Sequence, residues 1–440
     1  MESLLPEEVL HSAKKVTDEA EVFQISSQET PIHFEANRLK QIQTKESTSI
    51  ALRIFREGRI GFAQASGGDG VTSLIDMAVE TAQLGSVAKF QFPSLMSYPE
   101  VSIFDPQVEK VTMEEMVKMG EELIDEITQH TSDILCDVGM TKGTASVHIL
   151  NSQGGAASYN KSFFSFSLEG VLIRNEDMLF VADSEGSCRL PVGVARLAGD
   201  IIRQLEWARE KAAVPTKLLP VVFTPSGVAS AFFSPLGVAF NGKMVLEGAS
   251  PLKDKLGEQL FDARFSLWDD ATVAYGLGSC PCDDEGVGNR RLPLIAGGVV
   301  SNFLYDLQTA ALAGTQSTGH GRRTAGGFPK PGVSSLIISE GDVSFESMIA
   351  DIKEGLIVEQ LIGAEQGNLL SGDFGGNVLL GYKVENGKIV GRVKDTMISG
   401  NVYRVLKELL GIGDKGRWVE GILYTPHLYC PRISVAAKCR

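Results

Sequence analysis

Two cysteines and three carboxylates gather in one short stretch of this 440-residue chain, SCPCDDEG at residues 279–286. The thiols of Cys280 and Cys282 could contribute to a zinc site, because thiolate is a preferred ligand of zinc. A structural zinc site needs four ligands, however, and no second cysteine pair lies nearby in the sequence. A turn that carries two small thiols is therefore the favoured interpretation, and the paired carboxylates Asp283-Asp284, like Asp269-Asp270, are expected to be solvated in turns.

A histidine and two arginines form a second candidate stretch, STGHGRRTAGG at residues 317–327. His320, Arg322 and Arg323 could bind an anion or the carboxylate of a peptide, because arginine presents a planar fork of donors. The alternative is a flexible loop with solvated charges. A further hypothesis brings His320 and Arg322 together in space with the carboxylates of residues 283–285, as an unrecognised site of a peptidase or hydrolase in its own right.

The sequence motifs of the common catalytic sites are missing. The chain has no G-x-S-x-G, no phosphate-binding G-x-x-x-x-G-K-[ST], no G-x-G-x-x-G between a strand and a helix, and no pair of histidines four residues apart. Residues 221–242, VVFTPSGVASAFFSPLGVAFNG, read as strand, turn and helix without a charge or a histidine. We therefore assign no catalytic residue, no metal and no cofactor, and we expect residues 226–242 to be mostly buried.

The elements that must position these stretches indicate an α+β fold, because helices lie beside antiparallel strand patterns without a repeated βαβ rhythm. The expected parts are an N-terminal α+β domain at 1–214, with a sheet and long helices, and a C-terminal strand-rich α+β domain at 215–440. Thr112 and Glu115 predict a capping box, and Asn386-Gly387 predicts a hairpin. Helices are expected at 6–18, 71–84, 113–129, 193–212, 301–313, 344–354 and 401–410, and strands within 31–65 and 134–190 and at 336–339, 378–384 and 388–393.

Composition excludes several classes of function. The net charge of −14 disfavours direct nucleic-acid binding, because phosphate contacts need clustered Lys and Arg. No apolar run reaches the ~20 residues that a membrane helix needs. The N-terminal stretch lacks the basic start and apolar core of a signal peptide, so the six cysteines are expected to be reduced and the protein cytoplasmic.

Four separated blocks carry a resemblance to a known family. They are SIALRIFREGRIGFAQAS near the N-terminus, CDDEGVGNRRLPLIAGGVVSNFLYDLQTA, STGHGRR, and the long C-terminal block from LIISEGDVSFESM to VKDTMISGN. In order and spacing, over nearly the whole chain, they resemble the TldD/PmbA family, whose members are also labelled modulators of DNA gyrase.

The resemblance implies a paired system. TldD-like members resemble zinc peptidases with an H-E-x-x-x-H motif, and PmbA/TldE-like members lack the motif and partner them. Ser230, Ala231 and Pro235 stand here at the His, Glu and His positions, and we assign no role to Cys430. The implied protein is a non-catalytic subunit that forms dimers, with itself or with a TldD-like H-E-x-x-x-H subunit, in a complex that trims small or unfolded peptides. A regulator that binds a DNA enzyme such as gyrase remains the alternative.

Overall fold

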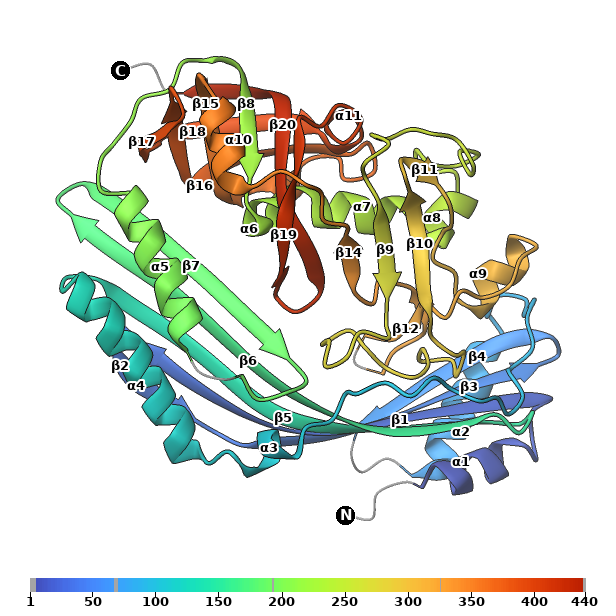
Figure 1. Cartoon of the computed structure of the whole chain (residues 1–440). Coiled ribbons are helices and arrows are strands. Elements are labelled where there is room, and N and C mark those ends of the chain that lie inside the picture. The colour runs from blue at the N-terminus through green and yellow to red at the C-terminus, as the bar shows by residue number, and fades with distance from the viewer. Residues whose placement is uncertain (1–4, 67–69, 192–193, 325, 438–440) are drawn as a thin grey trace.

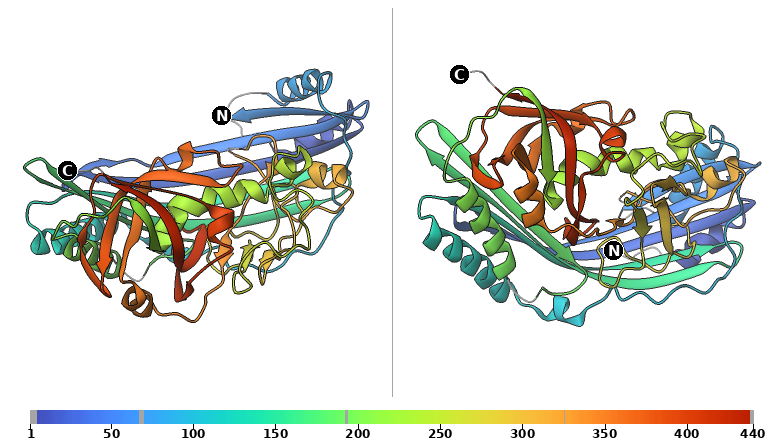
Figure 2. Two further views of the ribbon diagram at one scale, coloured as in Figure 1. Left: turned by 90° about the horizontal axis from the view of Figure 1, so that it is seen from above. Right: turned by 45° about the horizontal axis from the view of Figure 1, so that its top comes forward.

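The computed structural model describes residues 5–66, 70–191, 194–324 and 326–437. A long curved sheet made by the N-terminal half lies beneath a second sheet made by the C-terminal half (Figure 1). The prediction of an α+β fold is confirmed. Two further views show that the C-terminal sheet and its helices lie across one face of the long sheet (Figure 2).

The N-terminal sheet is antiparallel throughout and, among the described residues, has seven strands in the order β4-β3-β1-β5-β6-β7, with β2 paired to β1. β5 and β6 alternate buried and more exposed residues along much of their length, and the twist of such long strands curves the sheet. Its strands are β1 (Glu19–Glu35), β2 (Arg38–Ile42), β3 (Lys45–Arg56), β4 (Arg59–Ser66), β5 (Leu135–Asn151), β6 (Ala156–Arg174) and β7 (Asp177–Ser187).

Two pairs of helices cover the ends of this sheet. α1 (Pro6–Ala13) and α2 (Val71–Ala82) pack near β3 and β4, whereas α4 (Met113–His130) and α5 (Ala195–Trp207) lie at the other end, with the short α3 (Pro106–Lys110) between. The predicted capping box of α4 is confirmed. The Thr112 side chain accepts from the Glu115 backbone N–H at 3.1 Å, and the Glu115 carboxylate accepts from the Thr112 N–H at 2.7 Å.

The C-terminal sheet contains, in the part of the chain that the structure describes, eleven strands of mixed direction. Five of them close on themselves, because β8-β15-β16-β18-β20 is completed by a β20–β8 pairing. The strands are β8 (Lys217–Phe223), β9 (Leu267–Asp270), β10 (Arg291–Ala296), β11 (Val299–Val300), β14 (Leu336–Ile338), β15 (Glu354–Ile362), β16 (Asp373–Glu385), β17 (Lys388–Arg392), β18 (Thr396–Asn401), β19 (Gly411–Val419) and β20 (Leu423–Ala437); β12 (Gly321–Arg322) and β13 (Lys330–Pro331) form a separate ribbon.

Short helical segments connect these strands. The predicted hairpin at Asn386-Gly387 joins β16 to β17, and both residues have the positive φ of such a turn, 48° and 75°. The helix expected at 301–313 begins only after Asp306, which caps it, and the helix expected at 401–410 is a single turn. The segments are α6 (Pro225–Val228), η1 (Ala229–Phe233), α7 (Ser234–Ala239), α8 (Gly242–Leu246), α9 (Leu307–Leu312), α10 (Phe345–Asp351), η2 (Ala364–Gln366) and α11 (Val402–Val405).

The two sheets meet at a shared core. One cluster of buried side chains combines Leu197 and Ile201 of α5 with Val222 of β8 and with Leu380 and Tyr382 of β16. α5 is therefore packed between the sheet that precedes it and the sheet that follows it (Figure 1). The expected boundary at 214/215 lies in the connection between α5 and β8, but the two parts are not packed independently of each other.

Candidate functional site

The uncharged segment at residues 221–242 forms the end of β8 and a continuous run of helical turns. Thr224 caps α6, because its hydroxyl accepts from the Gly227 backbone N–H at 3.3 Å. Pro225 occupies the first turn, where its missing N–H is not needed. Close packing requires a glycine at 227, since a Cβ there would lie 2.2 Å from the Val358 carbonyl oxygen of β15.

The turn that follows α6 is wound as a π-helix. η1 covers Ala229–Phe233, and α7 continues the helix with Pro235 in its first turn. A proline disfavours an uninterrupted helix, but here the chain stays helical and changes its winding just before Pro235.

This winding suits the spacing of an H-E-x-x-x-H motif. Its two histidines are five residues apart, which places them about 140° apart around an α-helix but close to one face of a π-helix, whose bonds run from i to i+5. Ser230 and Pro235, which we expect at the two histidine positions, lie in this π-wound turn and in the first turn of α7, and neither is a histidine.

The side chains at the three motif positions do not fit a zinc ion. The Ser230 hydroxyl donates to the Ser226 carbonyl at 2.9 Å, and Ala231 and Pro235 carry no donor atom for a metal. Cys430 is buried on β20, where burial raises the pKa of its thiol and so disfavours the thiolate. The residues present at this position fit no peptidase zinc site, which takes three protein ligands.

The segment is buried as expected. The side chain of Phe232 is fully buried, with ring centroids 5.0 Å from Phe223 and 5.5 Å from Phe374. Phe233 is half-buried and borders a cavity instead. The uncharged segment formed by α6, η1 and α7 is thus part of the C-terminal core, and we call it the wedge. The accessible side of the wedge faces the N-terminal sheet.

Two hollows separate the sheets next to this wedge. The helix cavity, of about 480 Å³, is bordered by Ser226, Ser230 and Phe233 and by residues of β6, β7 and the β19–β20 hairpin. The hairpin cleft, of about 980 Å³, lies on the other side of the same hairpin and is bordered by aromatic residues that include Trp418 and Tyr424. Figure 1 shows the hairpin reaching from the C-terminal sheet down towards β6 and β7.

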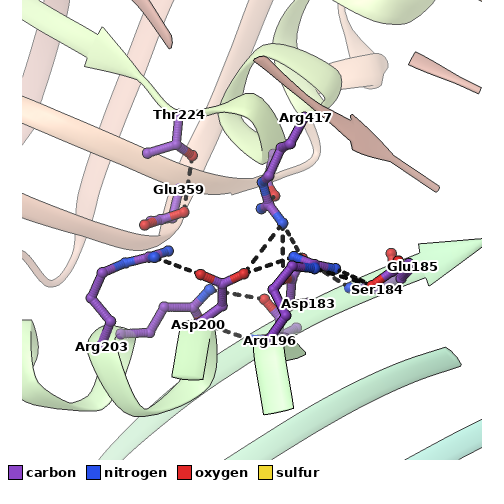
Figure 3. Close-up of polar contacts among 12 residues, drawn as sticks. Asp183, Ser184, Glu185, Arg196, Asp200, Arg203, Thr224, Glu359 and Arg417 are labelled. Atoms are coloured by element: carbon purple, nitrogen blue, oxygen red, sulfur yellow. Dashed lines mark hydrogen bonds and ion pairs between the residues drawn. The ribbon is translucent and has the colours of Figure 1, made fainter. Parts of the chain in front are cut away.

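A cluster of charges fixes the hairpin to the N-terminal half (Figure 3). Arg417 of β19 donates from Nη1 to both oxygens of Asp183 at 2.8 Å each, and from Nη2 to the Ser226 hydroxyl at 2.8 Å. Arg196 of α5 binds the same Asp183 at 3.4 Å and Asp200 at 2.8 Å. Burial raises the pKa of Asp183 although Arg417 opposes this, so the carboxylate depends on its arginine partners to stay ionised.

A second buried carboxylate lies beside this cluster. Glu359 of β15 is 1% exposed, and its Oε2 accepts from the Thr224 hydroxyl at 2.9 Å. Its other oxygen, Oε1, is buried and has no hydrogen-bond partner among the described residues. Burial raises the pKa of Glu359, and the charge of Arg203 opposes that rise.

His320 is buried, Arg322 and Arg323 are half-buried residues, and all three bond to partners within the chain. His320 contacts Asp269 at 3.1 Å through Nε2 and Thr318 at 2.9 Å through Nδ1. Arg322 donates to the Cys280 sulfur at 3.0 Å and to Ser334. The Arg323 side chain is 1% exposed and bonds Glu21 of β1. The alternative of a flexible, solvated loop is therefore wrong, because these groups are committed to internal partners.

The carboxylates of residues 283–285 are not solvated either. Asp283 and Glu285 are fully buried. Asp283 accepts three backbone N–H bonds, from Glu285, Val287 and Gly321, at 2.8–3.0 Å, and burial together with Glu285 raises its pKa to about 8. The solvated-turn interpretation is wrong, because the acidic stretch bonds the arginines and backbone that surround it.

Arg53 connects this buried network to the N-terminal sheet. It donates to Glu285 at 2.6 Å and to Glu21 at 3.0 Å, and all three side chains are at most 1% exposed. Glu285 also accepts from the Leu307 backbone N–H at 2.7 Å. Of the charges that sequence patterns suggested for chemistry, Glu285 and Arg323 thus bind residues of the N-terminal sheet.

The charged residues in the middle of apolar strands carry a signal that motif searches do not use. Arg53 in SIALRIF and Glu359 in GLIVEQLI stand where a strand is otherwise continuously apolar. Such a charge has to find a buried partner, so its position alone marks it as part of a network. Nothing comparable marks Asp183 or Arg417, which lie in mixed sequence.

Three absences concern the described residues. Among them, no group of three or more His, Cys, Asp or Glu side chains is placed to hold a metal ion. The cysteines in that part of the chain are buried and form no disulfide, and Cys439 lies outside it. No helix in the described ranges combines the length and the apolar character needed to cross a membrane.

Comparison with known proteins agrees with this architecture. The PmbA/TldA metallopeptidase C-terminal domain matches residues 216–437, and PmbA/TldA metallopeptidase domain 1 matches residues 20–82. An uncharacterised protein of Methanocaldococcus jannaschii is 26% identical over 415 residues, which cover 93% of this chain and 94% of that protein. A protein of Methanothermobacter thermautotrophicus named metalloprotease is 25% identical over 414 residues, covering 89% and 87%.

Among solved structures, TldE from Thermococcus kodakarensis superposes with a TM-score of 0.90 at 24% identity, covering 98% of this chain and 99% of TldE. That similarity establishes a shared fold. Because the C-terminal domain match alone spans half of the sequence, and the domain 1 match lies at the expected place before it, this chain belongs to the TldD/PmbA family.

Proposed function

We propose that this chain is a non-catalytic, PmbA/TldE-like subunit of a TldD/PmbA-type metallopeptidase complex that trims small or unfolded peptides. One observation supports the proposal: of the residues expected at the motif positions, Ser230 and Ala231 lie in a π-wound turn and Pro235 follows in α7, and none of the three is a normal zinc ligand. A water-activating glutamate, which the chemistry also requires, is missing at Ala231.

The hairpin cleft supports a role in peptide binding. Among the described residues, β7 is the last strand of its sheet, and β19 pairs with β20 and is bridged to Val343 at Gly413, so the edges beside the cleft that have no strand partner are those of β7 and of residues 417–419. An extended peptide adds to such an edge through backbone bonds that do not depend on its sequence. Gln204 already caps one position of β7, because its amide bonds the Ala182 N–H at 3.1 Å and C=O at 3.0 Å.

Zinc content and peptidase activity test the proposal. The purified chain should bind no stoichiometric zinc by elemental analysis and should cleave no peptide alone. Mixed with an H-E-x-x-x-H relative from the same source, it should co-purify with that subunit and enhance cleavage. One zinc per chain together with chelator-sensitive cleavage by the isolated chain would contradict the proposal.

The cleft has its own test in the mixed complex. Trp418→Ala removes an aromatic surface from the hairpin cleft and should raise the KM for peptide with little change in kcat, because it removes binding that is equal in ground and transition state. Trp268→Ala is the matched control, since Trp268 lies on β9 and does not border the cleft. Equal KM values for both variants would place peptide binding elsewhere.

A further inference from the structure

A third cavity, the Trp207 cavity, lies between α5, α10, β15 and β19 and has a volume of about 660 Å³. That volume is within the range of small-molecule sites in proteins. Its apolar side is formed by Trp207 and Phe345, whose rings stack with centroids 5.8 Å apart, and by Ile349 and Ile389.

Two buried polar atoms of the lining residues lack hydrogen-bond partners among the described residues; one belongs to Arg203, whose Cζ lies 5.3 Å from the centroid of the Trp207 ring. Glu359 Oε1 is an acceptor without a donor, and Arg203 Nε–H is a donor without an acceptor, among the described residues. Both residues border the cavity. Arg203 donates from Nη1 to Asp200 at 2.5 Å. Among the described residues, it forms no ion pair with Glu359. Figure 3 shows Glu359 between Thr224 and Arg203.

The surroundings favour opposite charges at the two atoms. Arg203 and Arg417 border the cavity, paired with Asp200 and Asp183, and His427, which borders it too, is kept neutral because burial and these two arginines lower its pKa to about 4. The free oxygen of Glu359 provides the complementary acceptor. A bound anion would leave Glu359 without a donor, and a bound cation would leave Arg203 without an acceptor.

We propose that the Trp207 cavity binds a free α-amino acid as its zwitterion. The ammonium group donates to Glu359 Oε1, the carboxylate accepts from Arg203 Nε–H, and an apolar side chain packs against Trp207 and Phe345. The site adjoins the hairpin cleft, with which it shares Asp200, Gly416 and Arg417, and its occupation does not depend on the peptidase role proposed above.

Titration calorimetry on the full chain tests the ligand chemistry, with L-leucine as the probe. Leucine should bind to a single site, whereas N-acetyl-L-leucine, which lacks the ammonium, and L-leucinamide, which lacks the carboxylate, should bind at least about tenfold more weakly. Inorganic phosphate should not compete. Absence of leucine binding, or equal binding of the blocked compounds, would overturn the proposal and leave an ordered water as the partner of both atoms.

Two variants test the residues. Glu359→Gln keeps the acceptor for the Thr224 hydroxyl but presents a poorer partner to an ammonium, and Arg203→Lys keeps a charge beside Asp200 but removes the Nε–H. Each should weaken leucine binding at least about tenfold. Glu354→Gln, on the same strand but outside the cavity, should leave it unchanged.

Circular dichroism and the thermal midpoint identify any variant that fails to fold. If Glu359→Gln fails, Arg203→Lys still decides, because its substituted side chain can retain the contact with Asp200. Leucine binding that is unchanged in a folded Arg203→Lys or Glu359→Gln protein would overturn the assignment of the site.

Discussion

Arg53 illustrates how a single residue couples the halves of this molecule. Its guanidinium is buried between Glu21 of its own sheet and Glu285 of the other half. Its Cζ lies 4.9 Å from the ring centroid of Phe90 and 5.1 Å from that of Phe92. Removing one partner of a buried ion network is costly, because the remaining charges lose their compensation while staying out of water.

Arg53→Met should therefore lower the free energy of unfolding by about 3–5 kcal/mol, since it leaves the Glu285 carboxylate without its cation. Urea-induced unfolding measures the change. Arg56→Met is the matched control, because Arg56 is exposed on the same strand and has no ion pair among the described residues, and it should change the free energy by less than about 0.5 kcal/mol. Equal losses in both variants would contradict the network.

Asp306 gives the fold a dependence on pH. Its Oδ1 accepts from the Thr309 N–H and hydroxyl at 2.7 Å each, and burial, with the charge of Glu285 adding to it, raises its pKa to about 6. The folded protein thus holds a proton that the unfolded chain loses near pH 4, so this group's contribution to stability falls as pH rises from about 4 to about 6.

Asp306→Asn keeps the acceptor oxygen of the cap and removes the titration. The difference in thermal midpoint, variant minus wild type, should shift in favour of the variant between about pH 4 and about pH 7. Calorimetric scans at both pH values give that difference. A difference that is the same at the two pH values would show that Asp306 does not titrate in this window.

Elements whose signal lies in neighbouring residues were predicted correctly from the sequence. Elements that depend on contacts between distant parts of the chain were not. The capping box at Thr112 and the hairpin at Asn386 depend on neighbours in sequence, and both were predicted. β1 begins at Glu19, although the expected strands started only at residue 31, because its first part has polar residues among apolar ones and gains its hydrogen bonds from distant β3 and β5.

The sequence predicted those properties of the candidate site that depend on residue type alone. The sequence shows directly that Ser230 and Ala231 are not zinc ligands. The π-helical winding of the turn that contains them depends on packing against β15 and β16. His320 and Arg323 were singled out for their chemistry, but the structure shows that their partners, Asp269 and Glu21, come from elsewhere in the chain. No spacing rule reveals such partners.

Position 227 in the wedge allows the packing against β15 to be tested by adding a single methyl group. Gly227→Ala places a Cβ 2.2 Å from the Val358 carbonyl, and backbone cannot yield as a flexible side chain can. We expect a loss of stability of about 1–3 kcal/mol, as overpacking usually costs. Gly199→Ala in α5 is the control, because its Cβ would meet no atom and alanine favours helix; a loss there as large as at 227 would contradict the argument.

For the molecule as a whole, association follows from the proposed role. We expect a dimer when the chain is purified alone and a heterodimer when an H-E-x-x-x-H relative is added, with an interface of roughly 1,200–2,000 Å² in total. Light scattering at micromolar concentration measures both. A monomer in the first experiment would exclude self-association, and a monomer in both would contradict the role as a subunit.

The shared core also determines how the chain can be divided. α5 belongs to the N-terminal half, yet Leu197 and Ile201 are buried together with Leu380 and Tyr382 of β16. The ion pairs Arg417–Asp183 and Arg392–Asp177 cross the same interface. Separating the halves exposes apolar surface at a cost of about 25 cal/mol per Å² and leaves these charges without partners.

Residues 1–214 expressed alone should therefore show no cooperative thermal transition, and co-expression with residues 215–440 should restore the transition near that of the intact chain. Differential scanning calorimetry of the fragment, of the reassembled pair and of the full chain measures this. A fragment that unfolds cooperatively on its own, with the dispersed amide resonances of a packed core, would show that the N-terminal sheet and its helices need only each other. Loss of the transition with recovery on pairing would instead establish that the helix between the two sheets is stable only when both are present.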